Sequence, residues 1–401
     1  MTVKIDLNRC KGCNYCRVAI ACPSEDQCTN CQACIDACPS SARTSIQESP
    51  KLTQITCYIN GYREQLKNRQ TVLQALQFTG YKISYTFPSK NSLFTPCRTG
   101  GCYSCAVLVD NELRQACITP IRDGMKIETD VSNRNPLRII SGFQGHFVGG
   151  VGTPKYIMPS SHSGYLEVAC FASGCLYRCS TCQNWQITYL SKAQPLSPLQ
   201  AASQLTATRL HFDVDRLAIS GGESILNRRW LLEFVTHLKK LNSDSKTRIH
   251  IDTNAAILTS DYIDDLVVAG MTDIGPDLKG FSIDTFMKIT NIKDKELADK
   301  YLKTSWNAVK YTLENYKDEV FLGVGIPFNN TFMNLEELAE IGTVLAGWDP
   351  NIQVTVLDYR PEFRASFLKR PSLHEMRIVK DVLIGSGLTN VICQTLTGYI
   401  K

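Results

Sequence analysis

Cysteine is the residue whose number and spacing in this chain point most directly to chemistry. The 401 residues include 18 cysteines, and 16 of them fall within residues 10–38, 97–117 and 170–182. The first residues contain no apolar segment typical of a signal peptide, and thiols in a reducing compartment seldom form structural disulfides. Thiolates repeated at short, regular intervals are sets of metal ligands. We therefore expect metal-cluster chemistry, with Cys57 and Cys393 outside the ligand sets.

The first group of cysteines has two halves, each with three closely spaced residues and a fourth farther on. The sequence reads Cys10-x2-Cys13-x2-Cys16-x5-Cys22 and then Cys28-x2-Cys31-x2-Cys34-x3-Cys38-Pro39. In the bacterial ferredoxin run, which the second half matches, the fourth cysteine binds the other cluster. We therefore expect one [4Fe-4S] cluster on Cys10, Cys13, Cys16 and Cys38, and a second on Cys22, Cys28, Cys31 and Cys34. The alternative is a pair of structural zinc sites. The segment resembles the two-cluster ferredoxins.

Residues 51–130 combine a hairpin signal, a short helix and a second cysteine set. Residues 54–59 alternate in polarity and end at Asn60-Gly61, and residues 71–79 have helical apolar spacing before Gly80. The cysteines then read Cys97-x4-Cys102-x2-Cys105-x11-Cys117, which is the plant-type [2Fe-2S] pattern. The segment resembles the β-grasp ferredoxin domains of succinate dehydrogenase and of molybdenum hydroxylases, and a structural zinc site is the alternative.

The third group contains three thiolates without an evident fourth ligand downstream: Cys175-x3-Cys179-x2-Cys182. Because [4Fe-4S] clusters are normally held by four cysteines, three would leave one iron open to a substrate or cofactor. Gly221-Gly222-Glu223 follows a predicted strand about forty residues later. Together these motifs resemble the radical S-adenosylmethionine (radical SAM) superfamily. Residues 250–255, 276–280 and 182–185 are similar to its pyruvate formate-lyase-activating-enzyme-like branch.

The resemblance implies roles for particular residues. The three cysteines would hold the catalytic cluster, and Cys170, on the predicted strand, is expected in the core. The other candidate SAM-binding residues are Gly221, Gly222 and Glu223 for the methionine ammonium, Asp252 and Asn254 for the ribose, and Asp277 and Lys279 for orienting SAM or substrate. An Asp–Lys pair is as often a structural ion pair. Tyr359, Arg360 and Arg364 are weaker candidates to face substrate.

These motifs need strands that end where the chemistry occurs. We expect strands near residues 165–171, 215–220, 248–253, 273–278, 320–326 and 352–358, alternating with helices near 198–211, 227–241, 260–269, 296–316, 333–346 and 373–385. Such alternation predicts a parallel sheet with right-handed crossovers, and in barrels of this kind the active site lies at the carboxyl ends of the strands. We therefore expect an α/β protein with a partial (β/α)6 TIM-like radical SAM barrel.

The predicted organisation has four parts: a two-cluster ferredoxin-like module (1–50), a β-grasp [2Fe-2S] domain (51–130), a linker or wrapping arm (131–164) and the barrel (165–401). Hydrophobic residues at 43% and charged residues at 20% suit a chain with a real core. The net charge of +5 has mixed signs and no long basic run, so no nucleic-acid partner is expected. No apolar run approaches the length of a membrane span, and an oxygen-poor cytoplasm is the expected setting.

The favoured function is that of a radical SAM oxidoreductase, which cleaves SAM reductively to a 5′-deoxyadenosyl radical. Its cofactors would be three [4Fe-4S] clusters, one [2Fe-2S] cluster and SAM, with the fused ferredoxin domains relaying electrons from an external low-potential donor. Resemblance to the activating-enzyme branch favours a glycyl-radical-type protein as substrate. Two alternatives stay open: modification or oxidation of a small molecule or peptide, and a multi-cluster electron-transfer subunit without catalysis.

Overall fold

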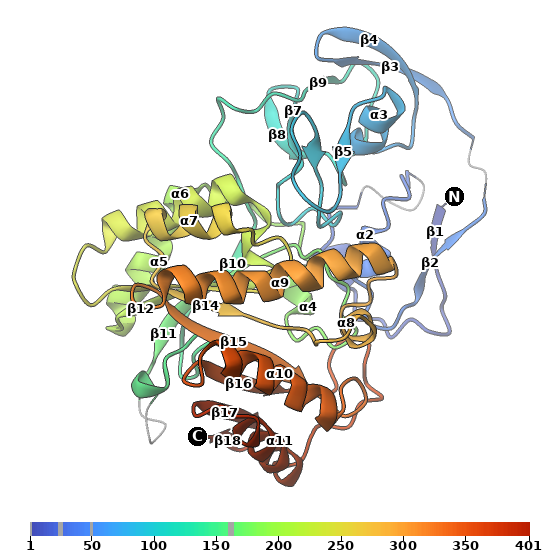
Figure 1. Ribbon diagram of the computed structural model, residues 1–401. Coiled ribbons are helices and arrows are strands. Elements are labelled where there is room, and N and C mark those ends of the chain that lie inside the picture. Colours follow the sequence, from blue (N-terminus) through green and yellow to red (C-terminus); the bar gives the residue numbers. More distant parts are fainter. Residues whose placement is uncertain (1, 23–26, 49–50, 159–163) are drawn as a thin grey trace. The chain divides into compact units, whose positions relative to one another are not determined.

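The computed structural model describes residues 2–22, 27–48, 51–158 and 164–401. The chain divides into two compact units (Figure 1). The first comprises residues 1–141, 172–176 and 184–197, and the second comprises residues 142–171, 177–183 and 198–401. Part of the predicted linker, residues 159–163, lies outside the described residues. The chain thus passes from the first unit to the second between residues 176 and 177, and returns between residues 183 and 184.

The second unit is built on a nine-stranded sheet whose spatial order follows the sequence from β10 to β18. Its strands are β10 (Ile140–His146), β11 (Glu167–Ala172), β12 (Arg216–Gly221), β13 (Arg248–Thr253), β14 (Asp273–Pro276), β15 (Phe321–Phe328), β16 (Gln353–Asp358), β17 (Val391–Thr395) and β18 (Gly398–Ile400). From β12 to β17 each neighbouring pair is parallel, and β18 returns antiparallel. The mixed α/β class is confirmed, whereas the six-repeat barrel stays a prediction.

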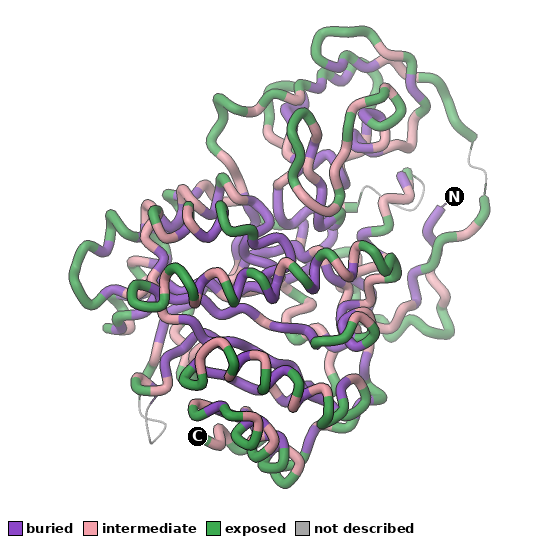
Figure 2. Tube along the Cα trace, viewed as in Figure 1, coloured by how far each residue is buried: buried purple, intermediate pink, exposed green. Residues whose placement is uncertain are grey.

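Helices connect the parallel strands, as the alternation predicts. They are α5 (Pro198–Phe212), α6 (Arg228–Leu241), α7 (Ser260–Ala269), α8 (Ile283–Thr290), α9 (Lys295–Tyr316), α10 (Leu335–Trp348) and α11 (Leu373–Gly385). Side-chain caps fix several starts: Asn227 accepts from the Trp230 amide, and Ser372 forms a capping box with Glu375. The sheet strands are largely buried, while the helices alternate between buried and exposed turns (Figure 2).

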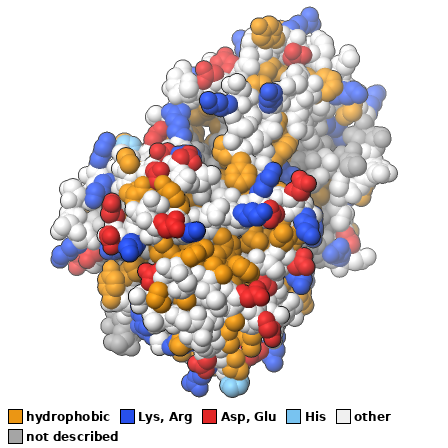
Figure 3. Space-filling view, viewed as in Figure 1, with side chains coloured by type: hydrophobic (Ala, Val, Ile, Leu, Met, Phe, Trp, Pro, Cys, Tyr) orange, Lys and Arg blue, Asp and Glu red, His pale blue; other side chains and the backbone are white. Residues whose placement is uncertain are grey.

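The predicted strands and helices agree with the observed ones within about two residues at each end. Among the described helices of the second unit, α8 was not predicted, because it is short and directly precedes α9. Among the described residues, no helix has the length and apolar character needed to cross a membrane. Lys and Arg side chains are interspersed with Asp and Glu over the face seen in Figure 3, which agrees with the mixed-sign composition.

The first unit contains a five-stranded sheet of order β4-β3-β9-β7-β8. Its strands are β3 (Gln54–Ile59), β4 (Tyr62–Lys67), β7 (Ala106–Val109), β8 (Glu112–Gln115) and β9 (Lys126–Glu128). The expected hairpin turn at Asn60-Gly61 is present, with φ of 50° and 84° at its two residues. The helix α3 (Val72–Phe78) starts in a capping box between Thr71 and Gln74. The hairpin and helix predictions are therefore confirmed.

The N-terminal segment of the same unit is a small strand pair with two single-turn helices. β1 (Thr2–Ile5) pairs antiparallel with β2 (Arg43–Ile46), and α1 (Tyr15–Val18) and α2 (Ala33–Asp36) lie between them in sequence. The left-handed residues Asn14 and Gln32 begin these helices, and each stands one position after a Cys-x2-Cys pair. The backbone therefore turns sharply at equivalent points of the two cysteine repeats.

The segment expected to be a linker is more ordered than its composition indicates. Residues 140–146 form β10 at the sheet edge, and residues 150–153 pack against the strands of the second unit. An added Cβ at Gly152 would lie 2.6 Å from His250 Nε2 and 2.7 Å from the Ile274 carbonyl oxygen. Glycines that permit this close approach also erase hydrophobic periodicity, so the sequence pattern could not reveal it.

Candidate functional site

Four N-terminal cysteines lie close enough to influence one another. Burial, together with the neighbouring thiols of Cys31, Cys22 and Cys28, raises the pKa of Cys34 to about 12. The opposing cation is Arg43, whose charge lowers that pKa. The three neighbours of Cys34 are thus the other cysteines that the spacing assigns to the same [4Fe-4S] cluster.

Cys16 and Cys38, assigned to the other N-terminal cluster, both meet Arg43. Its Nη2 donates to Cys16 Sγ at 3.2 Å, and the Ala42 amide donates to Cys38 Sγ at 3.2 Å. Burial raises the pKa of Cys38, but hydrogen bonds from the Ser40 hydroxyl and from backbone amides at 40, 42 and 43 outweigh it and lower that pKa. Donors of this kind stabilise cluster-ligating sulfurs. The two other expected ligands, Cys10 and Cys13, are exposed.

The four cysteines of the [2Fe-2S] pattern are all buried: Cys97, Cys102, Cys105 and Cys117. Cys102 Sγ lies 3.1 Å from Cys97 Sγ. Hydrogen bonds with the Cys105 and Cys97 thiols, with burial, raise the pKa of Cys117. The four sulfurs thus converge, and their chemistry fits an iron–sulfur cluster rather than isolated core thiols. In the described chain no group of three or more His, Cys, Asp or Glu side chains is arranged to hold a metal ion, so this assignment rests on residue type, burial and sulfur contacts.

The three-cysteine segment follows β11 and precedes α4 (Trp185–Thr188). Cys175 belongs to the first unit, whereas Cys179 and Cys182 belong to the second. In the second unit the segment is anchored by its backbone: the Arg178 amide donates to Thr290 O at 3.0 Å, and Ser180 O accepts from the Arg364 amide at 3.0 Å. Both anchors come from connections that follow strands of the sheet.

Lys279 is a buried cation near the Cys179 thiol. Its Nζ donates to Asp277 Oδ2 at 2.9 Å and lies 5.5 Å from the centre of the Tyr359 ring. Burial raises the pKa of Cys179 to about 12, against the lowering effect of the Lys279 charge. Burial lowers the pKa of Lys279, but Asp277, Tyr359 and Cys179 raise it by more than burial lowers it. The net pKa lies above its usual value, so this amine stays protonated. Two predicted site residues and one weaker candidate, Tyr359, therefore meet beside a predicted ligand.

Glu223 is held by hydrogen bonds from the next strand and from its own turn. Its Oε1 accepts from Thr253 Oγ1 at 2.6 Å, and its Oε2 accepts from the Asn254 amide at 2.7 Å. The Ile225 amide also donates to Oε1, at 3.3 Å. Only 1% of Glu223 is exposed. The carboxylate therefore fixes the ends of β12 and β13 against each other, which sets the position of the preceding Gly221 and Gly222.

Asp252 and Asn254 occupy different surroundings, although Asp252 lies near the end of β13 and Asn254 directly follows it. The Asn254 side chain accepts from the Ala256 amide at 3.1 Å and shapes the turn after β13. Asp252 Oδ1 lies 3.1 Å from His250 Nε2, and an added Cβ at Gly150 would lie 2.6 Å from Asp252 Oδ2. The structure thus places Asp252 against a buried histidine and the 150–153 segment.

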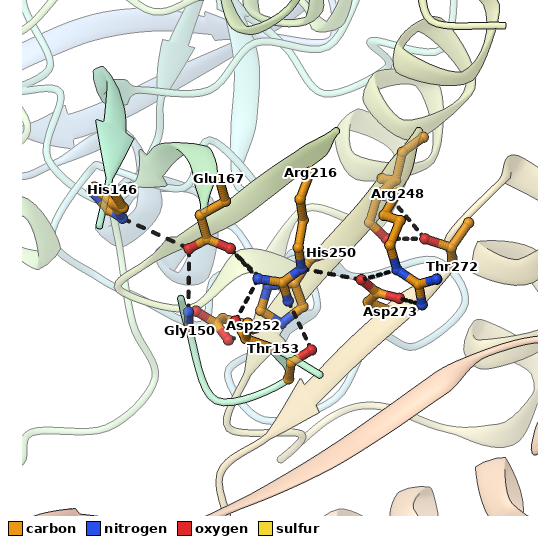
Figure 4. Close-up of polar contacts among 12 residues, drawn as sticks. His146, Gly150, Thr153, Glu167, Arg216, Arg248, His250, Asp252, Thr272 and Asp273 are labelled. Carbon is orange, nitrogen blue, oxygen red and sulfur yellow. Dashed lines mark hydrogen bonds and ion pairs between the residues drawn. The ribbon is translucent and has the colours of Figure 1, made fainter. Parts of the chain in front are cut away.

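This histidine belongs to a buried charged network that sequence analysis missed (Figure 4). Arg216 forms ion pairs with Glu167 and with Asp273, and it donates to Gly152 O at 2.8 Å and Thr153 Oγ1 at 2.6 Å. All these groups are nearly fully buried. Glu167, Arg216 and Asp273 are each a lone charge at the start of a strand, and their partners Gly152 and Thr153 lie in the predicted linker, so no spacing signal marks them.

The arrangement has a clear polarity along the sheet. The ion pairs of Arg216 and Arg248 with Asp273 join the amino-terminal residues of β12, β13 and β14. Glu223, Asn254, Asp277 and Lys279 follow the carboxyl ends of the same strands. Parallel strands carry their carboxyl ends to one edge, where α/β proteins bind ligands. Ion pairs join the strands at the amino-terminal edge of the sheet, and the predicted site residues lie at the carboxyl-terminal edge. The buried cysteines Cys57 and Cys170 lie in strands, as expected.

Comparison with protein families matches two stretches of the chain. Residues 170–341 match the radical SAM superfamily, and residues 53–132 match the family described as a 2Fe-2S iron-sulfur cluster binding domain. No curated protein matches the chain.

Solved structures that are similar to part of this chain include the following three. SuiB of Streptococcus suis, bound to S-adenosylmethionine, is 17% identical with a TM-score of 0.41, covering 57% of this chain and 47% of that chain. The radical SAM enzyme coproporphyrinogen III oxidase (HemN) of Escherichia coli is 16% identical, with a TM-score of 0.37 and coverage of 50% and 53%. The FeFe-hydrogenase maturase HydG of Carboxydothermus hydrogenoformans is 14% identical, with a TM-score of 0.40 and coverage of 56% and 58%. The chain spans about half the length of these proteins. It carries a radical SAM domain and a 2Fe-2S ferredoxin domain.

Proposed function

We propose that this protein is a radical SAM enzyme that cleaves SAM reductively and receives the electron through its own N-terminal clusters. The observation that carries the proposal is the placement of Lys279, Asp277 and Glu223 after the carboxyl ends of parallel strands, with Lys279 beside Cys179. A purely electron-carrying subunit needs no such collection of polar groups. A [4Fe-4S] cluster on Cys175, Cys179 and Cys182 would supply the electron that breaks a carbon–sulfur bond of SAM, giving methionine and a 5′-deoxyadenosyl radical.

The protein residues would contribute positioning and charge. Gly221 and Gly222 present backbone groups to the methionine end of SAM, because the buried carboxylate of Glu223 fixes their turn. Lys279 holds a positive charge beside Cys179, which favours the thiolate form that binds iron. Asp277 orients that cation through a 2.9 Å hydrogen bond. Tyr359 closes the other side of Lys279 and excludes water from it.

For the substrate we propose a glycine of a partner protein, by resemblance of residues 182–185, 250–255 and 276–280 to the activating-enzyme branch. The eight N-terminal cysteines would bind two further [4Fe-4S] clusters, and an external low-potential donor would reduce them. Modification of a small molecule or peptide uses the same radical and differs only in what occupies the site.

The test is an anaerobic assay of reconstituted protein with dithionite and SAM, with 5′-deoxyadenosine as product. The wild-type protein should form deoxyadenosine, and a Cys175→Ala/Cys179→Ala/Cys182→Ala variant should form none. A Cys393→Ala variant is the control, because it removes a buried thiol from β17 that belongs to no predicted ligand set. Absence of deoxyadenosine from the wild-type protein with all clusters reduced would leave the multi-cluster electron carrier as the better description.

A further inference from the structure

Within the first unit, the loop that carries two [2Fe-2S] cysteines packs directly on the chain that leads into Cys175. An added Cβ at Gly101 would lie 2.6 Å from Ser173 Cβ and 2.7 Å from the Gly174 amide nitrogen. An added Cβ at Gly174 would lie 2.9 Å from both the Cβ and the amide nitrogen of Cys102. The two backbones therefore touch with no side chain between them. We call these contacts of Gly101, Cys102, Ser173 and Gly174 the junction.

Hydrogen bonds tie the same two backbones together. The Ile139 amide donates to Gly101 O at 3.2 Å, and Ile139 O accepts from the Ser173 amide at 3.0 Å. Gly174 is fixed in turn by its amide, which donates to Thr188 O at 2.8 Å. The junction is therefore held from both sides, and a continuous path of covalent and hydrogen bonds joins Cys102 to Cys175.

The junction is buried and lies beside a buried cation. Arg138 is fully buried, and its Nη2 donates to the Ser173 carbonyl at 3.4 Å. Cys97, Cys102 and residues 172–175 are also buried. A positive charge in a dry setting stabilises added negative charge nearby far more than it would in water. The surroundings of the junction thus favour the arrival of an electron on either side of it.

From these observations we infer that the [2Fe-2S] cluster is the immediate electron donor to the cluster held by Cys175, and that the junction is the route. This inference rests on the proposed function. In the step, the reduced binuclear cluster gives up one electron and returns to its fully ferric state, and the oxidised cubane gains that electron. An external low-potential one-electron carrier restores the binuclear cluster through the N-terminal clusters.

Other contacts in the first unit indicate which of the two N-terminal cysteine sets lies next to the [2Fe-2S] domain. Ser191 Oγ accepts a hydrogen bond from the Ala21 amide at 2.9 Å. A Cβ added at Gly100 would lie 3.0 Å from Ser191 Cβ. Gln74 Nε2 donates to Thr29 O at 3.2 Å. Ala21 and Thr29 each adjoin a cysteine of one set: Cys22, Cys28, Cys31 and Cys34. This second N-terminal set is therefore the one next to the [2Fe-2S] domain.

A competing route would bypass the binuclear cluster. Tyr15, which precedes Cys16, packs edge-on against Trp185, with ring centres 4.9 Å apart. Trp185 is three residues beyond Cys182, whereas Gly174 is bonded directly to Cys175. Because electron transfer slows steeply with distance through protein, the junction is the favoured route, and the Tyr15 route is an outcome the experiment must separate.

The first test uses electron paramagnetic resonance of the anaerobic, fully loaded protein. In the wild-type protein the signal of the reduced [2Fe-2S] cluster should relax faster when the Cys175 cluster is also reduced, because neighbouring paramagnets couple. The Cys175→Ala/Cys179→Ala/Cys182→Ala variant, which keeps the other clusters, supplies the uncoupled reference. Equal relaxation in the two proteins would overturn the inference.

The second test disturbs the junction without removing a ligand. Gly101→Ala inserts a methyl group into the Ser173–Gly174 backbone, so it should push the two backbones apart and weaken the relaxation enhancement. Gly124→Ala is the control, since it lies in the same domain, has φ of 76° and meets nothing within 4 Å. It imposes backbone strain without displacing the loop, so it should keep the wild-type relaxation. Loss of coupling in both variants would contradict a role specific to the junction.

The third test separates this inference from the proposed function. A Cys102→Ser variant that lacks the binuclear cluster should lose rapid reduction of the Cys175 cluster by a protein donor, as followed by freeze-quench spectroscopy. Retention of that rapid reduction would favour the Tyr15 route and overturn the inference. Deoxyadenosine formation by the wild-type protein with dithionite is measured separately. Its absence would contradict the proposed function and leave the spectroscopic result on the junction intact.

Discussion

Replacing Arg216 by methionine tests whether the buried charge network holds the sheet of the second unit together. The Arg216 side chain is 1% exposed and faces two carboxylates, Glu167 and Asp273, that are 3% and 0% exposed. Removing one partner of a buried ion pair costs about 3–5 kcal/mol, because it leaves an uncompensated charge. Asp273 retains Arg248 as a partner. The expected loss is therefore about 3 kcal/mol, toward the lower end of that range.

The assay is anaerobic urea unfolding of the loaded protein, followed by far-ultraviolet circular dichroism. Arg229→Met is the matched control, because Arg229 forms an exposed i,i+4 pair with Glu233 at 3.1 Å. Its expected cost is below about 0.5 kcal/mol. Hydrogen exchange at β12 and β13 amides should rise in Arg216→Met and stay unchanged in the control.

A double variant makes the reasoning refutable. In the Arg216→Met background, Glu167→Gln removes a buried carboxylate that has lost its main partner, so it should recover about 1 kcal/mol or more. The reasoning is wrong if Arg216→Met costs less than about 1 kcal/mol. It is equally wrong if adding Glu167→Gln lowers the stability further, because that would mean the carboxylate is stabilising without its arginine.

Three further predictions concern pH, SAM binding and redox potential. Burial raises the pKa of Glu167, but the Arg216 charge and a His146 hydrogen bond lower it below its usual value. The contribution of Glu167 to stability is therefore present above the pKa of the unfolded state and is lost as pH falls through the pKa of the folded state. Urea midpoints should therefore fall less steeply in Glu167→Gln than in the wild-type protein as pH falls from about 5 to about 3, and parallel curves would contradict this. Thr253→Val removes the 2.6 Å hydrogen bond to Glu223 and should weaken SAM binding, measured by calorimetry, about tenfold. An unchanged affinity would mean that Glu223 does not contribute to the SAM site. Lys279→Met removes the cation near Cys179 and should make the potential of that cluster more negative in a redox titration, whereas an unchanged potential would place the cluster away from Lys279.

Most of the secondary structure could be predicted because its signals are local. Residues such as Ser372 with Glu375, or Asn60 with Gly61, stabilise a helix start or a hairpin turn through neighbours in sequence. The alternation of strands and helices in the second unit follows from the same short-range patterns. The segment 140–153 could not be predicted, since its strand and its buried turn depend on distant partners such as His250 and Ile274.

The candidate site also has features that the sequence predicts and features that only the structure shows. Cysteine spacing predicts the ligand sets, because iron–sulfur clusters are held by thiolates at short intervals. Asp277 and Lys279 could be named from their place after a strand, and the structure adds that Lys279 lies between Asp277 and Tyr359. Tyr359 is 80 residues away from Lys279 in sequence, so only packing could pair them.

The sequence by itself therefore determined the strand–helix order and the residues that follow each strand, and it predicted the metal chemistry. These depend on residue type and on interactions over a few positions. Only the tertiary structure decided that Arg216 joins Glu167 to Asp273, and that Gly101 touches Gly174. Both depend on two distant segments arriving at one place, where a single charge or the absence of a Cβ permits the contact. No local pattern encodes that arrival, because it is fixed by the packing of the whole unit.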